Sequence, residues 1–359
     1  MSTTARRVGM GCGLLALAVA IIWLCAERQP PPAPPQMPPP AIPRKVERPE
    51  PPHAVPKPAE TAPPPAAAER KPTPKESRTA ALKREIGKLN VSEAVRTVIG
   101  LGERPGGFNE RAAALRKLTR TLPADDAKAL AMFLDFRACE QDPQSRLATL
   151  EFEGLKNDAL VILLAQKDLP AGLGGQLVAM SRDAGHDDVW RTYCVQYIAE
   201  YYRRRWPAGT EPKEPGREQE ADAERLDMEK ACWDALRNPD STTAGTALLT
   251  LVDLSGEYDR IDSQKVAQAA MAMATDDACG EPARITALRI CGKLGRTEVL
   301  PAARMLAQIG GTVPLRMAAI ATVGDLGGAE DRELLASLSA DKEKRIGTIA
   351  KTALARLKK

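Results

Sequence analysis

From about residue 76 to the end of the chain, apolar residues recur every three or four positions, and no stretch alternates with a period of two over the length of a strand. This spacing predicts amphipathic helices of about ten to fifteen residues. Short polar joints containing glycine or proline separate them. The pattern therefore predicts an all-α fold of antiparallel helix pairs, beginning with helices expected over 77–89, 91–102, 109–122 and 123–137.

A near-repeat marks the C-terminal third of the chain. The segment RITALRICGKLG, 284–295, is echoed by RMAAIATVGDLG, 316–327. An arginine opens each copy and Gly-x-Leu-Gly closes it, and such self-similarity predicts an α-solenoid of stacked helix pairs. We expect the alanines to let helices approach closely, the glycines to release the chain at helix ends, and the arginines to tie neighbouring repeats together.

These two segments, each with a following helix (299–309 and 330–338), resemble HEAT repeats. The resemblance is strongest to the short Gly-Leu-Gly type that also occurs in phycobilisome-lyase-like proteins. A weaker copy covers 241–276, and the closing helix KRIGTIAKTALARLKK looks like a last half repeat with Ala353 in the glycine position. The resemblance implies HEAT-like repeats over 241–359, preceded by a helical domain of divergent repeats over 76–240.

The N-terminal region predicts a membrane segment. A short basic head (1–7) precedes an uncharged run of 19 residues, 8–26, which at about 1.5 Å per residue reaches across the hydrocarbon core of a bilayer. The basic head favours an uncleaved anchor with the remaining residues outside the cytoplasm. Cleavage after Ala20 would instead release a secreted protein, and a lipoprotein signal ending at Cys25 is a third interpretation. All three place the body outside the cytoplasm.

The segment 27–75 predicts a disordered, proline-rich linker. It carries 19 of the chain's 30 prolines and almost no large apolar side chain, so it cannot form a core. At about 3.1 Å per residue, the 46 residues from 29 to 74 would reach up to about 140 Å as an extended polyproline chain. Its composition resembles the Glu-Pro and Lys-Pro spacers of TonB-type envelope proteins, although an inert spacer would have the same composition.

Six of the chain's 13 aromatic residues fall within 190–206. Trp190, Tyr193, Tyr197 and Tyr201 are spaced three, four and four, so they form one stripe on a helix. The stripe fits either core packing or a surface for an anionic or peptide partner, because Tyr, Trp and Arg are enriched at binding hot spots. The candidate partner-binding residues are Trp190, Tyr193, Tyr197, Tyr201, Arg203, Arg204, Arg205 and Trp206.

Residues with catalytic chemistry are scarce. The two histidines, His53 and His186, are too few for a Ser-His-Asp triad or a histidine metal cluster, and His186 in GHDD is expected at a helix cap. We therefore predict no catalytic, cofactor-binding or metal-binding residues. A net charge of +4 is too small to predict nucleic-acid binding. Five cysteines lie in the body, an odd number that leaves at least one free thiol: Cys139, Cys194, Cys232, Cys279 and Cys291.

Together these features predict a single-pass inner-membrane protein whose HEAT-like body faces the periplasm and acts as a scaffold for a protein partner, without a cofactor or a small-molecule substrate. Two alternatives remain open. The chain could be an envelope-spanning, TonB-like mechanical or energy-coupling link, or a lyase-type enzyme related to the phycobilin-attachment HEAT proteins.

Overall fold

The structure, a computed structural model, describes residues 77–102, 105–118, 121–141, 147–209, 217–238, 241–309 and 311–357. The chain divides into two units, Met1–Arg70 and Lys71–Lys359. The first unit lies outside the described residues, and so do the predicted head, membrane segment and linker. No helix in the described part is both long enough and apolar enough to cross a membrane.

The described residues form an all-α structure of fifteen α-helices with three short 3-10 helices and no strand, which confirms the predicted fold class. The α-helices are α2 (Arg78–Ile86), α3 (Glu93–Ile99), α4 (Phe108–Arg116), α5 (Ala124–Leu134), α6 (Thr149–Leu164), α7 (Leu173–Arg182), α8 (Asp188–Arg205), α9 (Arg217–Ala235), α10 (Thr242–Ser255), α11 (Ser263–Thr275), α12 (Glu281–Lys293), α13 (Leu300–Ile309), α14 (Val313–Leu326), α15 (Arg332–Leu338) and α16 (Lys344–Arg356). The 3-10 helices are η1 (Ala138–Glu140), η3 (Thr297–Val299) and η4 (Ala329–Asp331).

Local sequence signals set many of these helix starts. Side-chain oxygens of Ser77, Ser92, Asp187 and Asp262 accept hydrogen bonds from the first-turn amides of α2, α3, α8 and α11. These residue types are preferred at helix N-termini because they satisfy amides that have no partner inside the helix. The helix α3 ends at Gly100, whose φ of 73° lies in the left-handed region that favours glycine.

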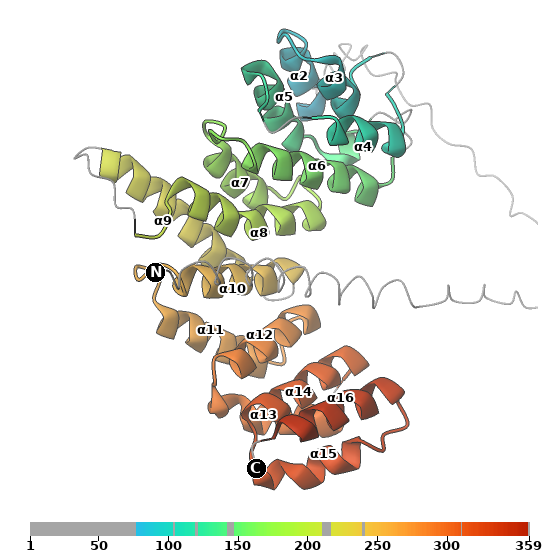
Figure 1. The fold of residues 1–359 in the computed structure, drawn as a ribbon, viewed down its shortest axis with the longest axis vertical. Coiled ribbons are helices and arrows are strands. Elements are labelled where there is room, and N and C mark those ends of the chain that lie inside the picture. The colour runs from blue at the N-terminus through green and yellow to red at the C-terminus, as the bar shows by residue number, and fades with distance from the viewer. Residues whose placement is uncertain are drawn as a thin grey trace, which may run out of the picture. The chain divides into compact units, whose positions relative to one another are not determined.

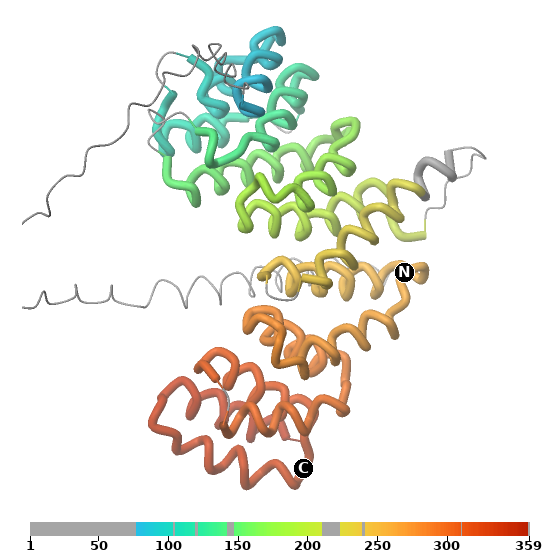
Figure 2. Tube along the Cα trace, turned by 180° about the vertical axis from the view of Figure 1, so that it is seen from behind, coloured from blue at the N-terminus to red at the C-terminus, as the bar shows by residue number. Residues whose placement is uncertain are grey.

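The helices of the second unit pack in series (Figures 1 and 2). The even-numbered helices from α6 to α16 each contact the next even-numbered helix, and the odd-numbered helices from α5 to α15 each contact the even-numbered helix that follows. The helix α10 contacts α8 and α9 as well as α12. The packing therefore continues without a break across the expected boundary at residue 240.

The first glycine of each Gly-x-Leu-Gly segment does not end a helix, contrary to the expectation. Gly292 and Gly324 lie inside α12 and α14. A Cβ atom added to Gly324 would lie 2.5 Å from the Cβ of Ala353 in α16, so this position sets how closely two even-numbered helices approach. Gly295, with a φ of 68°, takes the expected role and releases the chain after α12.

The repeat arginines connect helices, as expected. The Arg316 Nη2 lies 2.8 Å from Asp341 Oδ2, in the joint before α16, and its Nε donates to the Ala307 carbonyl at 3.2 Å. The Arg284 Nη2 lies 2.8 Å from Asp277 Oδ1, in the joint before α12. Each arginine therefore fixes its own helix to a neighbouring joint.

Candidate functional site

The structure buries three of the predicted partner-binding aromatics. Trp190, Tyr201 and Trp206 are 0%, 3% and 6% exposed, so no partner could reach them in this structure. Their prediction as surface residues is corrected, because α6, α7, α9 and α10 all pack against α8. Tyr193 and Tyr197 are only partly buried against the core, so they alone keep part of the stripe accessible.

The buried end of α8 forms an aromatic cluster with its neighbours. The Tyr202 ring lies edge-on to Trp206 and to Tyr258, with ring centroids 5.1 and 4.8 Å apart. The Tyr258 hydroxyl donates to the Trp206 carbonyl at 2.9 Å. These contacts connect the C-terminal end of α8 to the end of α10, and they explain why so many aromatics fall within one short segment.

Two of the three predicted partner-binding arginines are used inside the body. The Arg203 Nε donates to Glu257 Oε1 at 2.9 Å, and the Arg204 Nη2 donates to the Gln166 carbonyl at 2.6 Å. Arg205 is exposed. Because the first two arginines tie α8 to neighbouring segments, they do not form a free basic surface.

Two residues of the predicted site, Tyr193 and Tyr197, lie on the helix next to α6, which exposes apolar side chains that the sequence did not single out. Leu150 and Val161 are 71% and 45% exposed and lie on the same face of α6 as Asn157, since they are spaced seven and four residues from it. Burial, as the largest effect, raises the pKa of Tyr197 to about 12, so its hydroxyl stays protonated at neutral pH. The side chain of Asn157 is close enough to Tyr197 to oppose this rise in the pKa of its hydroxyl, which places the α8 tyrosine beside this face of α6. We call Leu150, Asn157, Val161, Tyr193 and Tyr197 the α6–α8 patch.

A buried ion pair lies behind this patch, and the sequence analysis did not find it. The Lys156 Nζ lies 3.0 Å from Glu153 Oε2, and the two side chains are 0% and 1% exposed. The same ammonium donates to the Phe136 carbonyl at 3.0 Å and lies 4.0 Å from the centroid of the Trp190 ring. Burial raises the pKa of Glu153 and lowers that of Lys156. A glutamate and a lysine spaced i, i+3 normally predict an exposed helix face. Only the packing of the helices could therefore show that this pair is buried.

His186 also differs from its expected role. Asp187 provides the cap of α8, whereas the buried His186 Nε2 lies 3.1 Å from Asp135 Oδ1. The Arg78 Nε donates to Asp135 Oδ2 at 2.9 Å. Burial alone would raise the pKa of Asp135, but hydrogen bonds from His186 and Arg78 outweigh it and lower that pKa. Asp135 therefore holds the first described helix, α2, against the end of α5.

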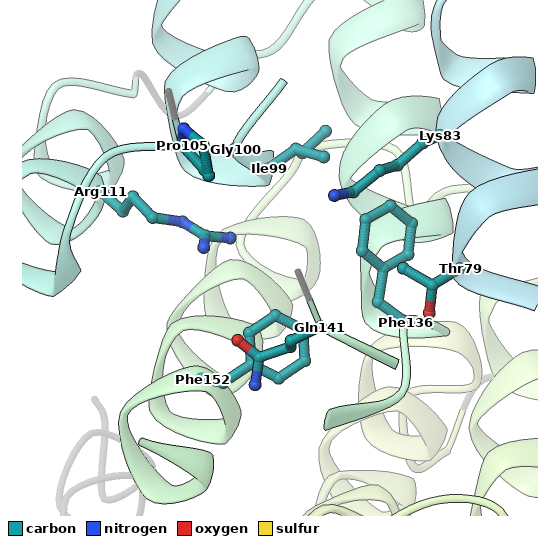
Figure 3. Close-up of a pocket in the computed structure, with 9 residues that line it drawn as sticks. All are labelled: Thr79, Lys83, Ile99, Gly100, Pro105, Arg111, Phe136, Gln141 and Phe152. Carbon is teal, nitrogen blue, oxygen red and sulfur yellow. The ribbon is translucent and has the colours of Figure 1, made fainter. Parts of the chain in front are cut away.

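A small pocket lies at the N-terminal end of the described body (Figure 3). Thr79 and Lys83 of α2, the end of α3, Arg111 of α4, and the rings of Phe136 and Phe152 line it. The space that it offers to water-sized groups is about 20 Å³, which is room for one or two waters.

No group of three or more His, Cys, Asp or Glu side chains in the described ranges is placed to hold a metal ion. The five cysteines of the body are free thiols, and burial raises the pKa of Cys232 to about 12, which makes it a poor nucleophile at neutral pH.

No protein-family model matches the chain, and no curated protein or solved structure matches it either. The resemblance to HEAT repeats therefore rests on the quoted repeats and remains a prediction.

Proposed function

We propose that this protein is a scaffold: an α-solenoid of HEAT-like helix pairs that binds a protein partner and performs no catalysis. The observation that carries the proposal is the serial packing of the even-numbered helices from α6 to α16. In such a stack each pair contacts mainly its neighbours, so the body presents long helical surfaces instead of one enclosed cavity. Proteins built in this way commonly use those surfaces for binding.

The α6–α8 patch is the surface that we propose for the partner. Leu150 and Val161 expose apolar side chains on a described helix, and the half-buried Tyr193 and Tyr197 place rigid rings beside them. Tyrosine supplies contact area at low cost in conformational entropy, and it is enriched where partners bind most strongly. Apolar residues rimmed by polar side chains such as Asn157 are typical of such surfaces.

We also propose that residues 8–26 anchor the chain in the inner membrane and that the linker holds the body on the periplasmic side. Support comes from the basic head before the apolar run and from the proline-rich composition that follows it. A secreted form after cleavage is the alternative. The linker would let the scaffold search for its partner within the envelope.

Crosslinking in intact membranes tests the scaffold. Proteins that crosslink to the full chain are identified by mass spectrometry and compared with those of a Leu150→Glu/Val161→Glu variant. The matched control is Met305→Glu/Ile309→Glu, which changes two other exposed apolar residues, 51% and 82% exposed, on α13. We expect a partner that the native chain and the control capture and that the patch variant loses. Equal capture by all three chains would refute the patch as the binding surface.

Shortening the linker separates the scaffold from the spanning link. Deleting half of residues 29–74 should leave partner capture by the scaffold intact, because flexible tethers tolerate changes in length. A link that must reach across the envelope would lose its function in the same variant. Loss of capture on shortening would therefore favour the energy-coupling alternative.

A further inference from the structure

Arg111 is a buried cation that has no ion-pair partner among the described residues. Its side chain belongs to α4 and is 2% exposed. The Nε donates to the Val98 carbonyl at 2.8 Å, whereas the buried Nη2 has no hydrogen-bond partner. The guanidinium carbon lies 5.7 and 5.9 Å from the ring centroids of Phe133 and Phe152. Aromatic faces attract a cation, but they do not replace the hydrogen bonds that a guanidinium loses on burial.

Burial lowers the pKa of Arg111 to about 10, which still leaves the side chain charged at neutral pH. A buried charge without a partner is costly, whereas a hydrogen-bonded, oppositely charged group offsets much of that cost. No ion pair of Arg111 with another described residue occurs in the structure. Among the described residues, therefore, none provides the anion or strongly polar group that the guanidinium requires.

The pocket beside Arg111 supplies the space for such a group (Figure 3). The guanidinium of Arg111 points toward the centre of the lining residues, with the Phe136 and Phe152 rings among the other walls. The nine lining residues include the basic side chain of Arg111 and no acidic one. A molecule bound there would meet positive charge and aromatic rings but no competing carboxylate of the pocket itself.

The size and shape of the pocket select the ligand. The space that it offers to water-sized groups, about 20 Å³, compares with about 10–15 Å³ for one water and is enough for a small planar group such as a carboxylate. The planar fork of arginine matches the planar carboxylate, and charged pairs of this kind make short, strong hydrogen bonds. We propose that this pocket binds one carboxylate group of a small organic acid or of a protein chain through the Arg111 guanidinium.

A ligand in this position would connect several helices. The lining residues Thr79 and Lys83 belong to α2, Ile99 to α3, Arg111 to α4 and Phe152 to α6. The helix α2 is the first described helix after the N-terminal unit. Bound carboxylate therefore stabilises the packing of α2, and this effect does not depend on whether the body is a scaffold.

Thermal unfolding of the full chain in detergent, followed by circular dichroism, tests the site. Sodium formate is titrated at constant ionic strength against sodium sulfate, whose anion is larger and tetrahedral instead of planar. Ligand that binds only the folded state raises the unfolding temperature as it saturates its site. We expect a saturating rise of about 2–4 °C in the native chain and none in Arg111→Met. The control Arg116→Met removes an exposed arginine of the same helix and should behave like the native chain.

A second pair of probes distinguishes the source of the carboxylate. A short peptide with a free C-terminus carries the same group as formate, and its amidated form lacks it. If only formate raises the unfolding temperature, the site binds a free acid. If the peptide with a free C-terminus raises it and the amidated peptide does not, the site binds the carboxylate of a protein chain. Either result, if lost in Arg111→Met, supports the site. No saturating rise with either probe, or the same rise in Arg111→Met, overturns it.

Two measurements on the native chain keep the test valid if Arg111→Met fails to fold. The ¹³C signal of labelled formate should broaden on addition of the protein, and excess unlabelled formate should reverse the broadening. Amide hydrogen exchange in α2 should slow at the same formate concentrations. If chloride raises the unfolding temperature and formate leaves it unchanged, the pocket binds a halide ion and not a carboxylate, and the proposal is refuted.

Discussion

The close approach of α14 and α16 at Gly324 makes a prediction whose sign depends on packing. Gly324→Ala would place a Cβ atom 2.5 Å from the Ala353 Cβ and 2.7 Å from its Cα. Alanine is a better helix former than glycine by about 0.5–1 kcal/mol. Overpacking a rigid contact costs about 1–3 kcal/mol, and here the contact is with backbone. We therefore expect a net loss of stability of about 1–2 kcal/mol.

Gly154→Ala is the matched control. Gly154 lies inside α6, and a Cβ atom added there would meet nothing within 4 Å. Only the helix-propensity term applies, so this variant should gain about 0.5–1 kcal/mol. The two substitutions are chemically identical and should change stability in opposite directions.

Urea unfolding of the full chain, followed by circular dichroism, measures both variants. Because stacked helices can unfold in parts, hydrogen exchange should also show that the loss in Gly324→Ala is concentrated in α14 and α16. Adding Ala353→Gly should rescue it only partly, since the 2.7 Å contact is with the Ala353 Cα. A gain in Gly324→Ala equal to that of Gly154→Ala would refute the close packing of these two helices.

Three further predictions concern buried charges and thiols. Lys156→Met should lower stability by about 3–5 kcal/mol because it leaves Glu153 buried without its partner, and adding Glu153→Leu should restore most of the loss in the same urea assay. The Arg304 Nε donates to Asp331 Oδ1 at 2.6 Å and lowers the pKa of this carboxyl. The stabilisation of the fold by this ion pair is therefore complete above the unfolded pKa of about 4 and is lost as pH falls through the lower folded value. Asp331→Asn should remove this loss from the acid unfolding curve. Among the body cysteines, the exposed Cys139 should react with a thiol reagent in the folded chain, and mass spectrometry should find the four buried cysteines modified only after unfolding.

The outcome at α8 shows why the predicted site could be found only in part. Its stripe of Trp190, Tyr193, Tyr197 and Tyr201 was correctly placed on one helix, because spacing alone determines which residues share a face. Whether that face is covered depends on α7, α9 and α10, which come from other parts of the chain. The structure therefore divides the stripe into buried and half-buried residues, a division that no local pattern contains.

The sequence by itself determined the all-helical fold, many of its joints and the repeat over 284–327, because helix periodicity, capping residues and glycines are local properties. Tertiary structure alone decided that Gly324 sets the approach of two helices, that Glu153 and Lys156 lie inside the body, and that Arg111 faces a pocket and has no ion-pair partner among the described residues. A charged residue on a helix has the same sequence pattern whether it faces water or a neighbour. The difference is the desolvation imposed by distant segments, and only the packed structure defines it.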